Sequence, residues 1–377
     1  MNKKLCILGS TGSVGTQVID VVSLLKDRYT ITGLSAYQNH EQLFRQAEDL
    51  NVRHVSLAKK PAEDFTTDLN IEYGTESLIS LCEEADEVVI ALSGISGLPA
   101  LDYCLRNNKK VFLANKEALV CGGPVIRKLM DASDSQVMPL DSEISAIYQC
   151  LQQHSTDEIS RILLTCSGGP FRTWSKEDIS LATPAQALKH PNWDMGCKIS
   201  IDSATLANKG LELMETRWFF DVDPAVITVV IHPESIIHSM VEFSDSSILA
   251  QLAEPDMRIP IFYAFNSPAR KTAPFKKLDI FETAGLTFEK PDLSRFPCLE
   301  LAYEALKLGH SMQVVYNAAD EIAADLFLAN RIKFYDINRI IFSSMKHFEG
   351  SSVYSLDDIY RLDKEVRDYI NKQSDRI

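Results

Sequence analysis

Apolar runs alternate with helical segments over the first 140 residues. The runs Lys4–Leu8, TITGLSA at 30–36, EVVIALSG at 87–94 and VFLANK at 111–116 are separated by stretches whose apolar positions recur at helical spacing. This order of strands and helices is typical of a doubly wound parallel sheet. We therefore predict an α/β fold that begins with a Rossmann-like domain over residues 1–141.

The pattern changes after this domain. RILLTCSGGPF at 161–171 and ITVVIHPESIIHSMVEFSD at 227–245 indicate strands joined by loops and helices, which predicts a central α+β domain over 142–265. Prolines and charged residues at 266–297 predict a surface linker. Helical spacing of the later apolar residues predicts a C-terminal helical bundle over 298–377.

A glycine-rich turn follows the first strand. In GSTGSVG, Gly9, Gly12 and Gly15 are spaced by three, and the helical string TQVIDVVSLL comes next. Strand, glycine turn and helix form the context of a dinucleotide site, where glycines let the backbone approach the pyrophosphate and Thr11 and Ser13 can donate to it. Because the spacing departs from G-x-G-x-x-G, the motif alone is only moderately specific.

The residues after the second strand bear on the choice of cofactor. An NAD enzyme usually places an acid there for the ribose 2′-hydroxyl, but this strand ends near Ser35 and is followed by Tyr37, Gln38 and Asn39. This permits a 2′-phosphate, although none of these positions is a lysine or arginine. The sequence therefore favours NADP.

Polar residues are dense between His190 and Thr216. We expect KISI at 198–201 to be a short strand, Asp202 or Ser203 to be an N-cap, and a helix to run from Ala204 through Phe220. Such a helix start would bind an anion such as phosphate, with help from the Ser203 hydroxyl.

One face of this helix would present Asn208, Lys209 and Glu212. A capped amphipathic helix with an ordinary Lys/Glu pair explains the same residues about equally well. The segment by itself leaves both interpretations open.

Two carboxylates occur in MPLDSE at 138–143. If the backbone is extended, alternation places Asp141 and Glu143 on one side, where they suit Mg²⁺ or Mn²⁺ because these cations take oxygen ligands. A solvated turn or an N-cap is the commoner explanation of Asp-Ser-Glu at the end of a strand. Without other evidence, that alternative is preferred.

Nine segments, in order along the chain, resemble the 1-deoxy-D-xylulose 5-phosphate reductoisomerase family. They are GSTGSVG at Gly9, LANKE at Leu113, PLDSE at Pro139, SGGPF at Ser167, HPNWDMG at His190, SIDSATLANKGLE at Ser200, HPESIIHSMVEF at His232, AEPDMRIPI at Ala253 and YNAADEIA at Tyr316. The resemblance implies reduction of 1-deoxy-D-xylulose 5-phosphate to 2-C-methyl-D-erythritol 4-phosphate with NADPH and Mg²⁺, Mn²⁺ or Co²⁺, in the non-mevalonate isoprenoid pathway. It also makes the central domain the catalytic one and implies a homodimer.

The resemblance also implies roles for individual residues. The metal ligands are Asp141, Glu143 and Glu212, which together with Lys116 are the catalytic residues. The substrate-binding residues are Lys116, Ser142, Glu143, Ser167, His190, Trp193, Ser203, Asn208, Lys209 and Glu212. The cofactor-binding residues are Thr11, Gly12, Ser13, Val14, Tyr37, Gln38, Asn39, Asn115, Glu117 and Gly196.

A flap over 190–196 closes over the substrate in similar enzymes. Here it contains Asp194, where relatives commonly have serine. The chain also departs from relatives at Tyr37–Asn39, where many have Gly-Lys-Asn.

Composition limits the possible partners. The formal charge is −14 with no basic run, which disfavours nucleic acid, and no segment is long and apolar enough for a membrane span. The eight cysteines include no Cys-x-x-Cys pair, so we expect reduced thiols in a cytoplasmic protein. We expect the basic start of the chain to be a first strand and no signal peptide.

Other polar groups are given structural explanations. His232, Glu234 and His238 are expected to form one face of a strand and to bind no metal. Asp320 and Glu321 are expected on a solvated helical face.

Two other functions remain as alternatives. A semialdehyde dehydrogenase would need a catalytic cysteine and no metal. Cys166, which precedes Ser167, could be a nucleophile, but no basic residue lies next to it in the sequence, so we expect a core thiol. A catalytically silent NADP-binding regulator would need no convergence of Asp141, Glu143 and Glu212.

Overall fold

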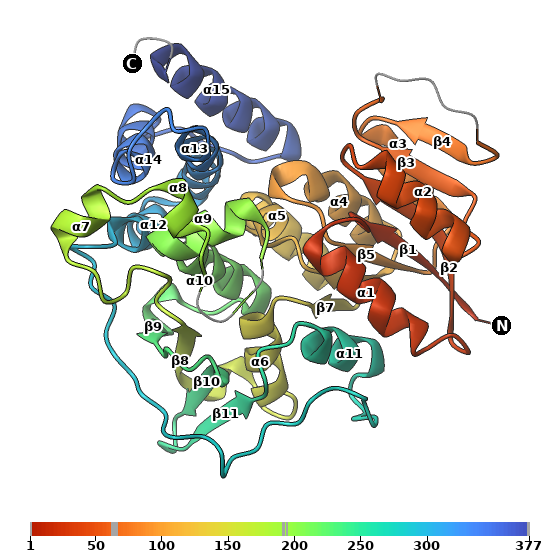
Figure 1. The fold of residues 1–377 in the computed structure, drawn as a ribbon, viewed down its shortest axis with the longest axis horizontal. Coiled ribbons are helices and arrows are strands. Elements are labelled where there is room, and N and C mark those ends of the chain that lie inside the picture. Colours follow the sequence, from red (N-terminus) through yellow and green to blue (C-terminus); the bar gives the residue numbers. More distant parts are fainter. Residues whose placement is uncertain (1, 62–66, 191–192, 194, 375–377) are drawn as a thin grey trace. The chain divides into compact units, whose positions relative to one another are not determined.

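The computed structural model describes residues 2–61, 67–190, 193 and 195–374 (Figure 1). The chain forms two compact units. Unit 1 comprises Met1–Ala118, Lys128–Ser145 and Asp256–Phe275, and unit 2 comprises Leu119–Arg127, Ala146–Pro255 and Lys276–Ile377. Because both units are assembled from separated stretches, they divide the chain differently from the predicted boundaries, which remain a prediction.

Unit 1 contains a seven-stranded sheet in the order β4-β3-β2-β1-β5-β6-β7. All of its pairings are parallel, which confirms the predicted doubly wound sheet. The strands are β1 Lys3–Leu8, β2 Tyr29–Ala36, β3 His54–Leu57, β4 Asn70–Tyr73, β5 Glu87–Ile90, β6 Lys110–Leu113 and β7 Val137–Pro139. The chain winds to one side from β1 through β4 and to the other from β5 through β7. Ligands of such sheets bind beyond the carboxyl ends of β1 and β5, where the winding direction reverses.

Unit 1 also contains helices, most of which connect these strands. They are α1 Ser13–Ser23, α2 His40–Asp49, α3 Glu76–Glu83, the 3₁₀ turn η1 Gly94–Gly97, α4 Leu98–Arg106 and, from later in the chain, α11 Arg258–Asn266. Helix α11 packs against α1. Its Phe265 stacks on Phe112 with ring centroids 4.0 Å apart and meets Tyr29 edge-on at 5.2 Å. These ring contacts attach α11 to the sheet.

Unit 2 contains a four-stranded sheet in the order β11-β10-β8-β9. Strand β8 (Ile159–Cys166) pairs in parallel with β9 (Ile227–Ile231) and antiparallel with β10 (Ile237–Phe243), and β10 pairs antiparallel with β11 (Ile248–Leu252). This agrees with the predicted α+β pattern. The prediction that His232 and Glu234 share a strand face with His238 is wrong, because only His238 belongs to a strand. His232 instead holds the loop, since its ring accepts from Ile237 N at 3.1 Å.

Most of the longer helices of unit 2 pack around α13. The helices of this unit are α7 Lys176–Ser180, α8 Pro184–Ala187, α9 Cys197–Thr205, α10 Ala207–Phe220, α12 Pro297–Leu308, α13 His310–Leu328, α14 Asp336–His347 and α15 Leu356–Ser374, with 3₁₀ turns η2 Thr156–Glu158 and η3 Pro224–Val226. Helix α13 contacts α9, α10, α12, α14 and α15. Small and apolar residues cover most of its surface, so it can be buried on nearly every side. Helices α5 (Lys116–Ala132) and α6 (Ser142–Cys150) are each divided between the two units.

Among the described residues, none of the helices combines the length and the apolar character that crossing a bilayer requires. All eight cysteines are free thiols.

Helix α5 is kinked at Gly123. Gly123 has φ 41° and ψ −124°, and Pro124 follows it. At the kink, the Cys121 carbonyl accepts a hydrogen bond from His310 Nε2 at 2.8 Å. A Cβ atom on Gly123 would lie 2.3 Å from the His310 ring, so both the positive φ and the available space require glycine.

We expect Gly123→Ala to lower the free energy of unfolding by about 3 kcal/mol, because backbone strain and overpacking act together. Gly285→Ala is the control, since a Cβ there meets nothing within 4 Å and its φ is not positive. Urea unfolding followed by circular dichroism measures both. Equal stability of the two variants would contradict this account of the kink.

Candidate active site

The glycine turn of unit 1 allows close approach of a ligand to the backbone. Gly9 has φ 85°, and a Cβ on Gly15 would lie 2.1 Å from the Gly9 carbonyl oxygen, so α1 packs directly on the turn. Helix α1 has Gly12 at its N-cap, with no side-chain cap and no acid in its first turn. Thr11, Ser13 and Val14 surround this N-terminus. Its N–H groups can therefore face an anion, which suits the pyrophosphate of a dinucleotide.

The end of β2 is held against this turn. Gly9 N and Ser10 N both donate to the Ser35 carbonyl, at 3.1 and 2.8 Å, and Gly9 N also donates to Ser35 Oγ at 3.0 Å. Tyr37 is exposed, and Asn39 caps α2 by accepting from Gln42 N at 3.2 Å. The structure thus places Tyr37, Gln38 and Asn39 on the edge of the sheet that bears the glycine turn.

Asn115 and Glu117 follow β6 at the same edge. Asn115 is fully buried, and its amide nitrogen donates to the Gly94 carbonyl at 2.9 Å and to Glu117 Oε2 at 2.7 Å. These contacts join the ends of β5 and β6. Asn115 therefore has a clear positioning role for the loops on this edge.

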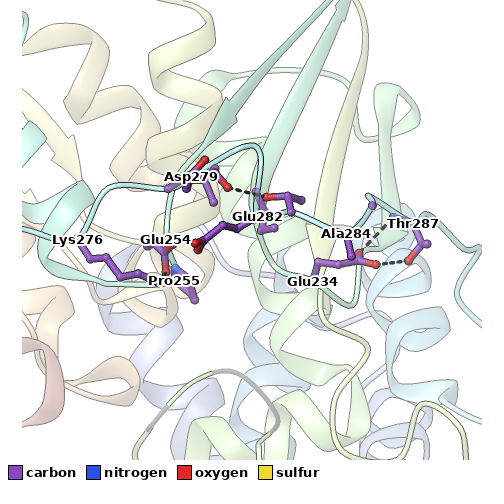
Figure 2. A pocket seen from close by; sticks show the side chains of 12 residues that line it. Glu234, Glu254, Pro255, Lys276, Asp279, Glu282, Ala284 and Thr287 are labelled. Carbon is purple, nitrogen blue, oxygen red and sulfur yellow. Dashed lines mark hydrogen bonds and ion pairs between the residues drawn. The ribbon is translucent and has the colours of Figure 1, made fainter.

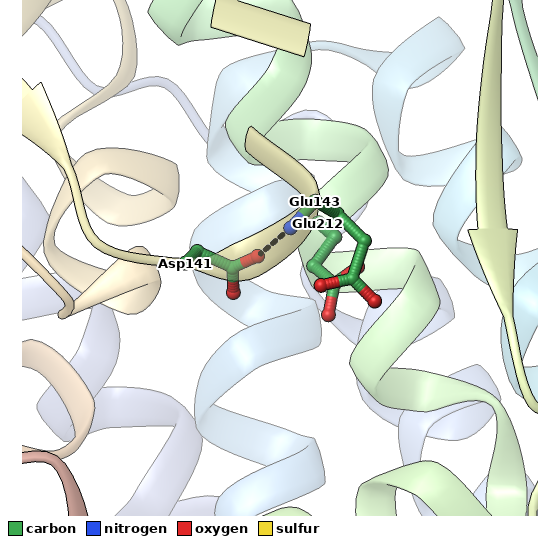
Figure 3. Close-up of side chains that lie close together, drawn as sticks. All are labelled: Asp141, Glu143 and Glu212. Atoms are coloured by element: carbon green, nitrogen blue, oxygen red, sulfur yellow. Dashed lines mark hydrogen bonds between the residues drawn. The ribbon is translucent and has the colours of Figure 1, made fainter. Parts of the chain in front are cut away.

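Lys116 and Asp141 form an ion pair in unit 1. Lys116 Nζ lies 2.6 Å from Asp141 Oδ2, and both side chains are less than one-tenth exposed. Asp141 Oδ1 also accepts from Glu143 N at 3.1 Å, as Figure 3 shows, while Ser142 Oγ donates to the Glu143 carboxylate. Asp141 therefore receives donors on both of its oxygens.

The backbone of Asp141–Glu143 is not extended, so the condition for placing both carboxylates on one side by alternation is not met. Strand β7 ends at Pro139 and α6 begins at Ser142, so Glu143 is in the first turn of a helix. The Asp141 side chain acts like an N-cap when it accepts from Glu143 N, which is the commoner explanation for Asp-Ser-Glu. Capping and metal binding are compatible here, because a carboxylate has several lone pairs.

The strand and the helix start predicted at 198–204 are also wrong. KISI belongs to α9, which begins after Gly196 and ends at Thr205, so Asp202 and Ser203 lie in its last turn. Leu206, with φ 62° and ψ 13°, separates α9 from α10. Ile201 and Ala204 are buried at helical spacing, and four residues with two isoleucines were too few to distinguish this pattern from a strand.

Because the helix boundary lies at Leu206, the helix N-terminus with its partial positive charge is at the start of α10 and not at Ser203. Asn208 and Lys209 are in the first turn of α10, and Leu206 provides no side-chain cap. Lys209 and Asn208 both donate to the Glu212 carboxylate. Lys209 is 2% exposed and Glu212 is 1% exposed, so this pair is almost completely removed from water. The α10 N-terminus is thus a better anion site than the predicted start at Ser203.

Ser167, His190 and Ser203 are also gathered in unit 2. Ser167 Oγ lies 3.0 Å from His190 Nε2 and accepts from Gly169 N at 3.2 Å. A Cβ on Gly169 would lie 2.5 Å from the Ser203 carbonyl oxygen, so the SGG loop packs directly against the end of α9. The polar residues predicted to bind phosphate therefore come from the β8 loop, the α9–α10 junction and His190.

His190 is a neutral hydrogen-bond donor. Burial, together with the charge of Lys209, lowers the pKa of His190 to about 4. Its Nδ1 accepts from Trp193 N at 3.0 Å, so its proton is on Nε2, which donates to Ser167 Oγ. The Ser167 hydroxyl proton can then be directed to another acceptor, such as a phosphate oxygen.

Gly196 is the N-cap residue of α9, with φ −59° and ψ 157°. Trp193 lies 6.1 Å from His238 between ring centroids. Pro191, Asn192 and Asp194 of the predicted flap lie outside the described residues.

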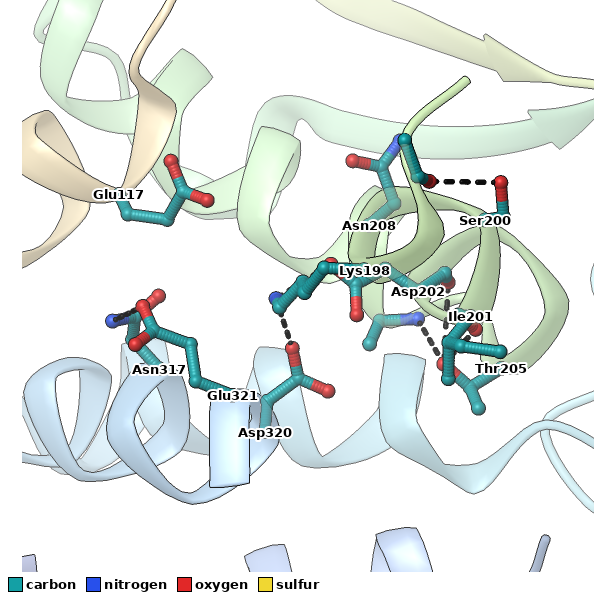
Figure 4. A network of polar contacts seen from close by, with 12 residues as sticks. Glu117, Lys198, Ser200, Ile201, Asp202, Thr205, Asn208, Asn317, Asp320 and Glu321 are labelled. Atoms are coloured by element: carbon teal, nitrogen blue, oxygen red, sulfur yellow. Dashed lines mark hydrogen bonds and ion pairs between the residues drawn. The ribbon is translucent and has the colours of Figure 1, made fainter. Parts of the chain in front are cut away.

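A buried ion network joins α9 to α13 (Figure 4). Lys198 Nζ lies 2.5 Å from Asp202 Oδ2 and 2.7 Å from Asp320 Oδ2. Asp202 is 2% exposed and Asp320 is 1% exposed. Burial, and then the charge of Asp320, raise the pKa of Asp202 well above its ordinary value. The two carboxylates share one lysine, so its charge can balance only one of them, and the network fixes the helix that ends beside Ser203.

The prediction that Asp320 lies on a solvated face is wrong. Asp320 is buried in α13, while Glu321 pairs with Arg367 of α15. The spacing of Lys198 and Asp202 was a usable signal for an i,i+4 pair, but nothing near position 320 in the sequence indicates its partner. The contact depends on the packing of α9 against α13.

A separate cavity of about 580 Å³ lies in unit 2 (Figure 2). It is lined by Glu234, Ile236, Glu254, Pro255, Lys276, Leu278, Asp279, Glu282, Thr283, Ala284, Gly285 and Thr287. Lys276 pairs with Glu254 at 3.1 Å, and Glu234 accepts from Thr287 Oγ1 at 2.6 Å. None of the predicted site residues lines this cavity.

Family models and relatives match nearly the whole chain. A model of 1-deoxy-D-xylulose 5-phosphate reductoisomerase matches residues 5–123, a model of that enzyme's C-terminal domain matches 137–220, and a DXP reductoisomerase C-terminal domain model matches 252–369. The reductoisomerase of Thermoanaerobacter pseudethanolicus is 48% identical over 378 residues, covering 98% of this chain and 99% of the relative. This chain belongs to the 1-deoxy-D-xylulose 5-phosphate reductoisomerase family.

Other members agree in sequence and in fold. A reductoisomerase of Bacillus thuringiensis is 44% identical, covering 99% of this chain and 98% of that protein. The Zymomonas mobilis reductoisomerase in complex with NADPH has a TM-score of 0.91 at 36% identity, with both chains covered completely. A reductoisomerase in complex with NADPH, fosmidomycin and magnesium has a TM-score of 0.93 at 35% identity, covering 99% of this chain and 98% of that one. The predicted fold class is thus confirmed, and family membership overrules both alternative functions.

We expect Lys198→Met to lower the free energy of unfolding by about 3 kcal/mol, because it leaves two buried carboxylates without their shared cation. Adding Asp320→Asn to Lys198→Met should restore part of the loss, since one buried charge is removed. Urea unfolding of the two single variants and the double variant measures this coupling. Lys198→Arg, which keeps the charge, is the control, and simple additivity of the two effects would argue against the network.

Proposed function

We propose that this protein catalyses the metal-dependent, NADPH-linked rearrangement and reduction of 1-deoxy-D-xylulose 5-phosphate to 2-C-methyl-D-erythritol 4-phosphate, in the non-mevalonate isoprenoid pathway. The observation that carries this proposal is family membership over almost the whole chain at 48% identity. Three of the predicted site residues, Asp141, Glu143 and Glu212, also support it, because their carboxylate oxygens lie close enough together to hold a metal ion.

The donor set suits a hard divalent cation. Asp141, Glu143 and Glu212, drawn in Figure 3, are carboxylates that could together hold a metal ion. Oxygen ligands of this kind are typical for Mg²⁺, Mn²⁺ and Co²⁺ sites that also bind substrate. We propose these three residues as the ligands. When bound, the cation would supply Lewis-acid polarisation of the substrate's carbonyl and hydroxyl oxygens.

The lysines next to these carboxylates can serve the substrate. Lys116 pairs with Asp141, and Lys209 pairs with Glu212. A divalent cation bound to the carboxylates would weaken both ion pairs, since the lysines would no longer be the main counterions. Lys209 could then donate to the substrate phosphate, while Lys116 and Ser142 could donate to its hydroxyls.

Neutral donors and one helix N-terminus would join Lys209 at the phosphate end of the substrate. Ser167, Ser203 and Asn208 offer hydroxyl and amide hydrogens, and the α10 N-terminus adds partial positive charge. His190 orients the Ser167 hydroxyl through Nε2. We propose that Trp193 also contacts the substrate. Binding energy from this remote phosphate would orient the reacting carbons, so losing it should lower turnover as well as affinity.

The glycine turn suits the dinucleotide. We propose that Thr11, Gly12, Ser13 and Val14 bind its pyrophosphate, because the uncapped α1 N-terminus lies there. Tyr37, Gln38 and Asn39 would lie beside its adenosine ribose, and Asn115, Glu117 and Gly196 would line the rest. NADPH would supply a hydride to the rearranged aldehyde.

The assay follows NADPH absorbance with purified protein and 1-deoxy-D-xylulose 5-phosphate, with Mg²⁺ or Mn²⁺ or with a chelator, and with NADH in parallel. We expect metal-dependent oxidation of NADPH. Glu212→Gln should lower kcat about a hundredfold or more, since a Lewis-acid contact is worth several kcal/mol. Glu300→Gln, an exposed change on α12, is the matched control. No oxidation by folded protein loaded with metal would refute the function.

The assembly we propose is a homodimer built through β11. This strand lies at the edge of the unit 2 sheet, and Ile248, Leu249 and Leu252 are 49%, 43% and 37% exposed. An exposed apolar edge strand is a template for pairing with another chain. We also propose a cytoplasmic location, which the eight free thiols support.

We expect sedimentation equilibrium to give the mass of a dimer, and Leu249→Lys to give a monomer, because a charge at the edge opposes pairing. Leu181→Lys is the control, since Leu181 is 78% exposed and lies outside the sheet. A wild-type monomer, or a dimer that tolerates Leu249→Lys, would rule out this interface.

A further inference from the structure

The binding residues proposed for NADPH include no cation for its 2′-phosphate. The cofactor differs from NADH by a 2′-phosphate, and NADP enzymes usually place a cation beside it. Tyr37, Gln38 and Asn39, which follow β2, bring no positive side chain to that position. The cation must therefore come from another part of the same sheet edge.

The neighbouring strand supplies a candidate. Strands β2 and β3 pair in parallel, with Ala36 beside Leu57. The ladder continues beyond both strands, because Ala58 N donates to the Ala36 carbonyl at 3.1 Å and Lys59 N donates to the Tyr37 carbonyl at 2.9 Å. Lys59 thus lies next to Tyr37 and Gln38, and Lys60 follows it.

Both lysines are exposed on the edge where the dinucleotide would bind. Their position relative to the glycine turn is set by hydrogen bonds: β2 is held to β3 by this ladder, and Ser35 is held to Gly9 and Ser10. Neighbouring strands are about 4.8 Å apart, so a lysine one strand away from the ribose can reach its 2′-oxygen. The lysines therefore need no rearrangement of the backbone.

Other features of this edge are compatible with a phosphate. Helix α2 begins directly after Asn39, so its positive end faces the same loop. Arg45, the other cation nearby, is on α2 and pairs with Glu41 at 3.4 Å. This exposed pair brings a carboxylate to the edge together with the cation, so Lys59 and Lys60 are the better placed cations.

We propose that Lys59, assisted by Lys60, binds the 2′-phosphate of NADPH and so determines the preference of this protein for NADPH over NADH. This inference rests on the proposed function. The cation comes from the residues after β3, and the residues after β2 provide only neutral contacts to the ribose.

Binding of the adenosine half of the cofactor tests this directly. Isothermal titration calorimetry with 2′,5′-ADP and with 5′-AMP compares two ligands that differ only in the 2′-phosphate. Wild-type protein should bind 2′,5′-ADP more tightly. In Lys59→Gln and in the double variant Lys59→Gln/Lys60→Gln, the affinity for 2′,5′-ADP should fall roughly tenfold or more, as expected for a lost charge-assisted hydrogen bond. The affinity for 5′-AMP should not change.

Lys26→Gln is the matched control. Lys26 is also an exposed lysine of unit 1, but it precedes β2 and so lies at the opposite edge of the sheet. Its substitution should leave both affinities unchanged. Equal losses in Lys26→Gln and Lys59→Gln would mean a general charge effect and would overturn the proposal.

Titration of NADPH and NADH separates this inference from the proposed function. Loss of the NADPH preference in the double variant supports the role of the lysines, whether or not the protein turns over 1-deoxy-D-xylulose 5-phosphate. An active enzyme whose double variant keeps the full preference would overturn the role of the lysines and leave the function intact. Wild-type protein that binds both dinucleotides equally would overturn the lysine role and the NADPH dependence together.

Discussion

The pairing of buried carboxylates with lysines is the interaction on which the candidate site depends. Lys116 holds Asp141 in unit 1, while Lys209 holds Glu212 and Lys198 holds both Asp202 and Asp320 in unit 2. Removing charges from water costs several kcal/mol for each ion, and a lone buried carboxylate would take up a proton. The lysines provide Asp141 and Glu212, the proposed metal ligands, with counterions in place of water.

The second constraint is close packing of backbone at the sheet edge. Gly15 brings α1 onto the glycine turn, and Gly169 brings the β8 loop onto the end of α9, at distances that no side chain would permit. Both contacts place helix ends or hydroxyl groups where an anion can be bound. The two candidate anion sites, one for a dinucleotide and one for a phosphosugar, thus have a common physical basis in helix N-termini whose N-cap residues, Gly12 and Leu206, provide no side-chain cap.

Several errors of sequence-based interpretation have one cause. KISI has the composition of a strand, and Asp141–Glu143 has the alternation of one, yet both segments contain helical residues. Over three or four residues, local preference is weak, and packing decides the conformation. The wrong prediction for Asp320 also reflects tertiary packing. A charged residue in a helix is usually solvated, unless a partner distant in the sequence, such as Lys198, stabilises it in the buried state.

The sequence by itself determined the parallel sheet, the glycine turn, the family and the identity of most candidate site residues. Long apolar runs and ordered motifs suffice for these, because hydrophobic periodicity and strand–turn–helix order are local properties. Only the tertiary structure decided that Lys198 joins Asp202 to Asp320, that His190 presents Nε2–H to Ser167, and that Lys59 lies beside Tyr37. Each of these depends on which elements pack or pair. The local sequence of an element does not indicate which distant element it will contact.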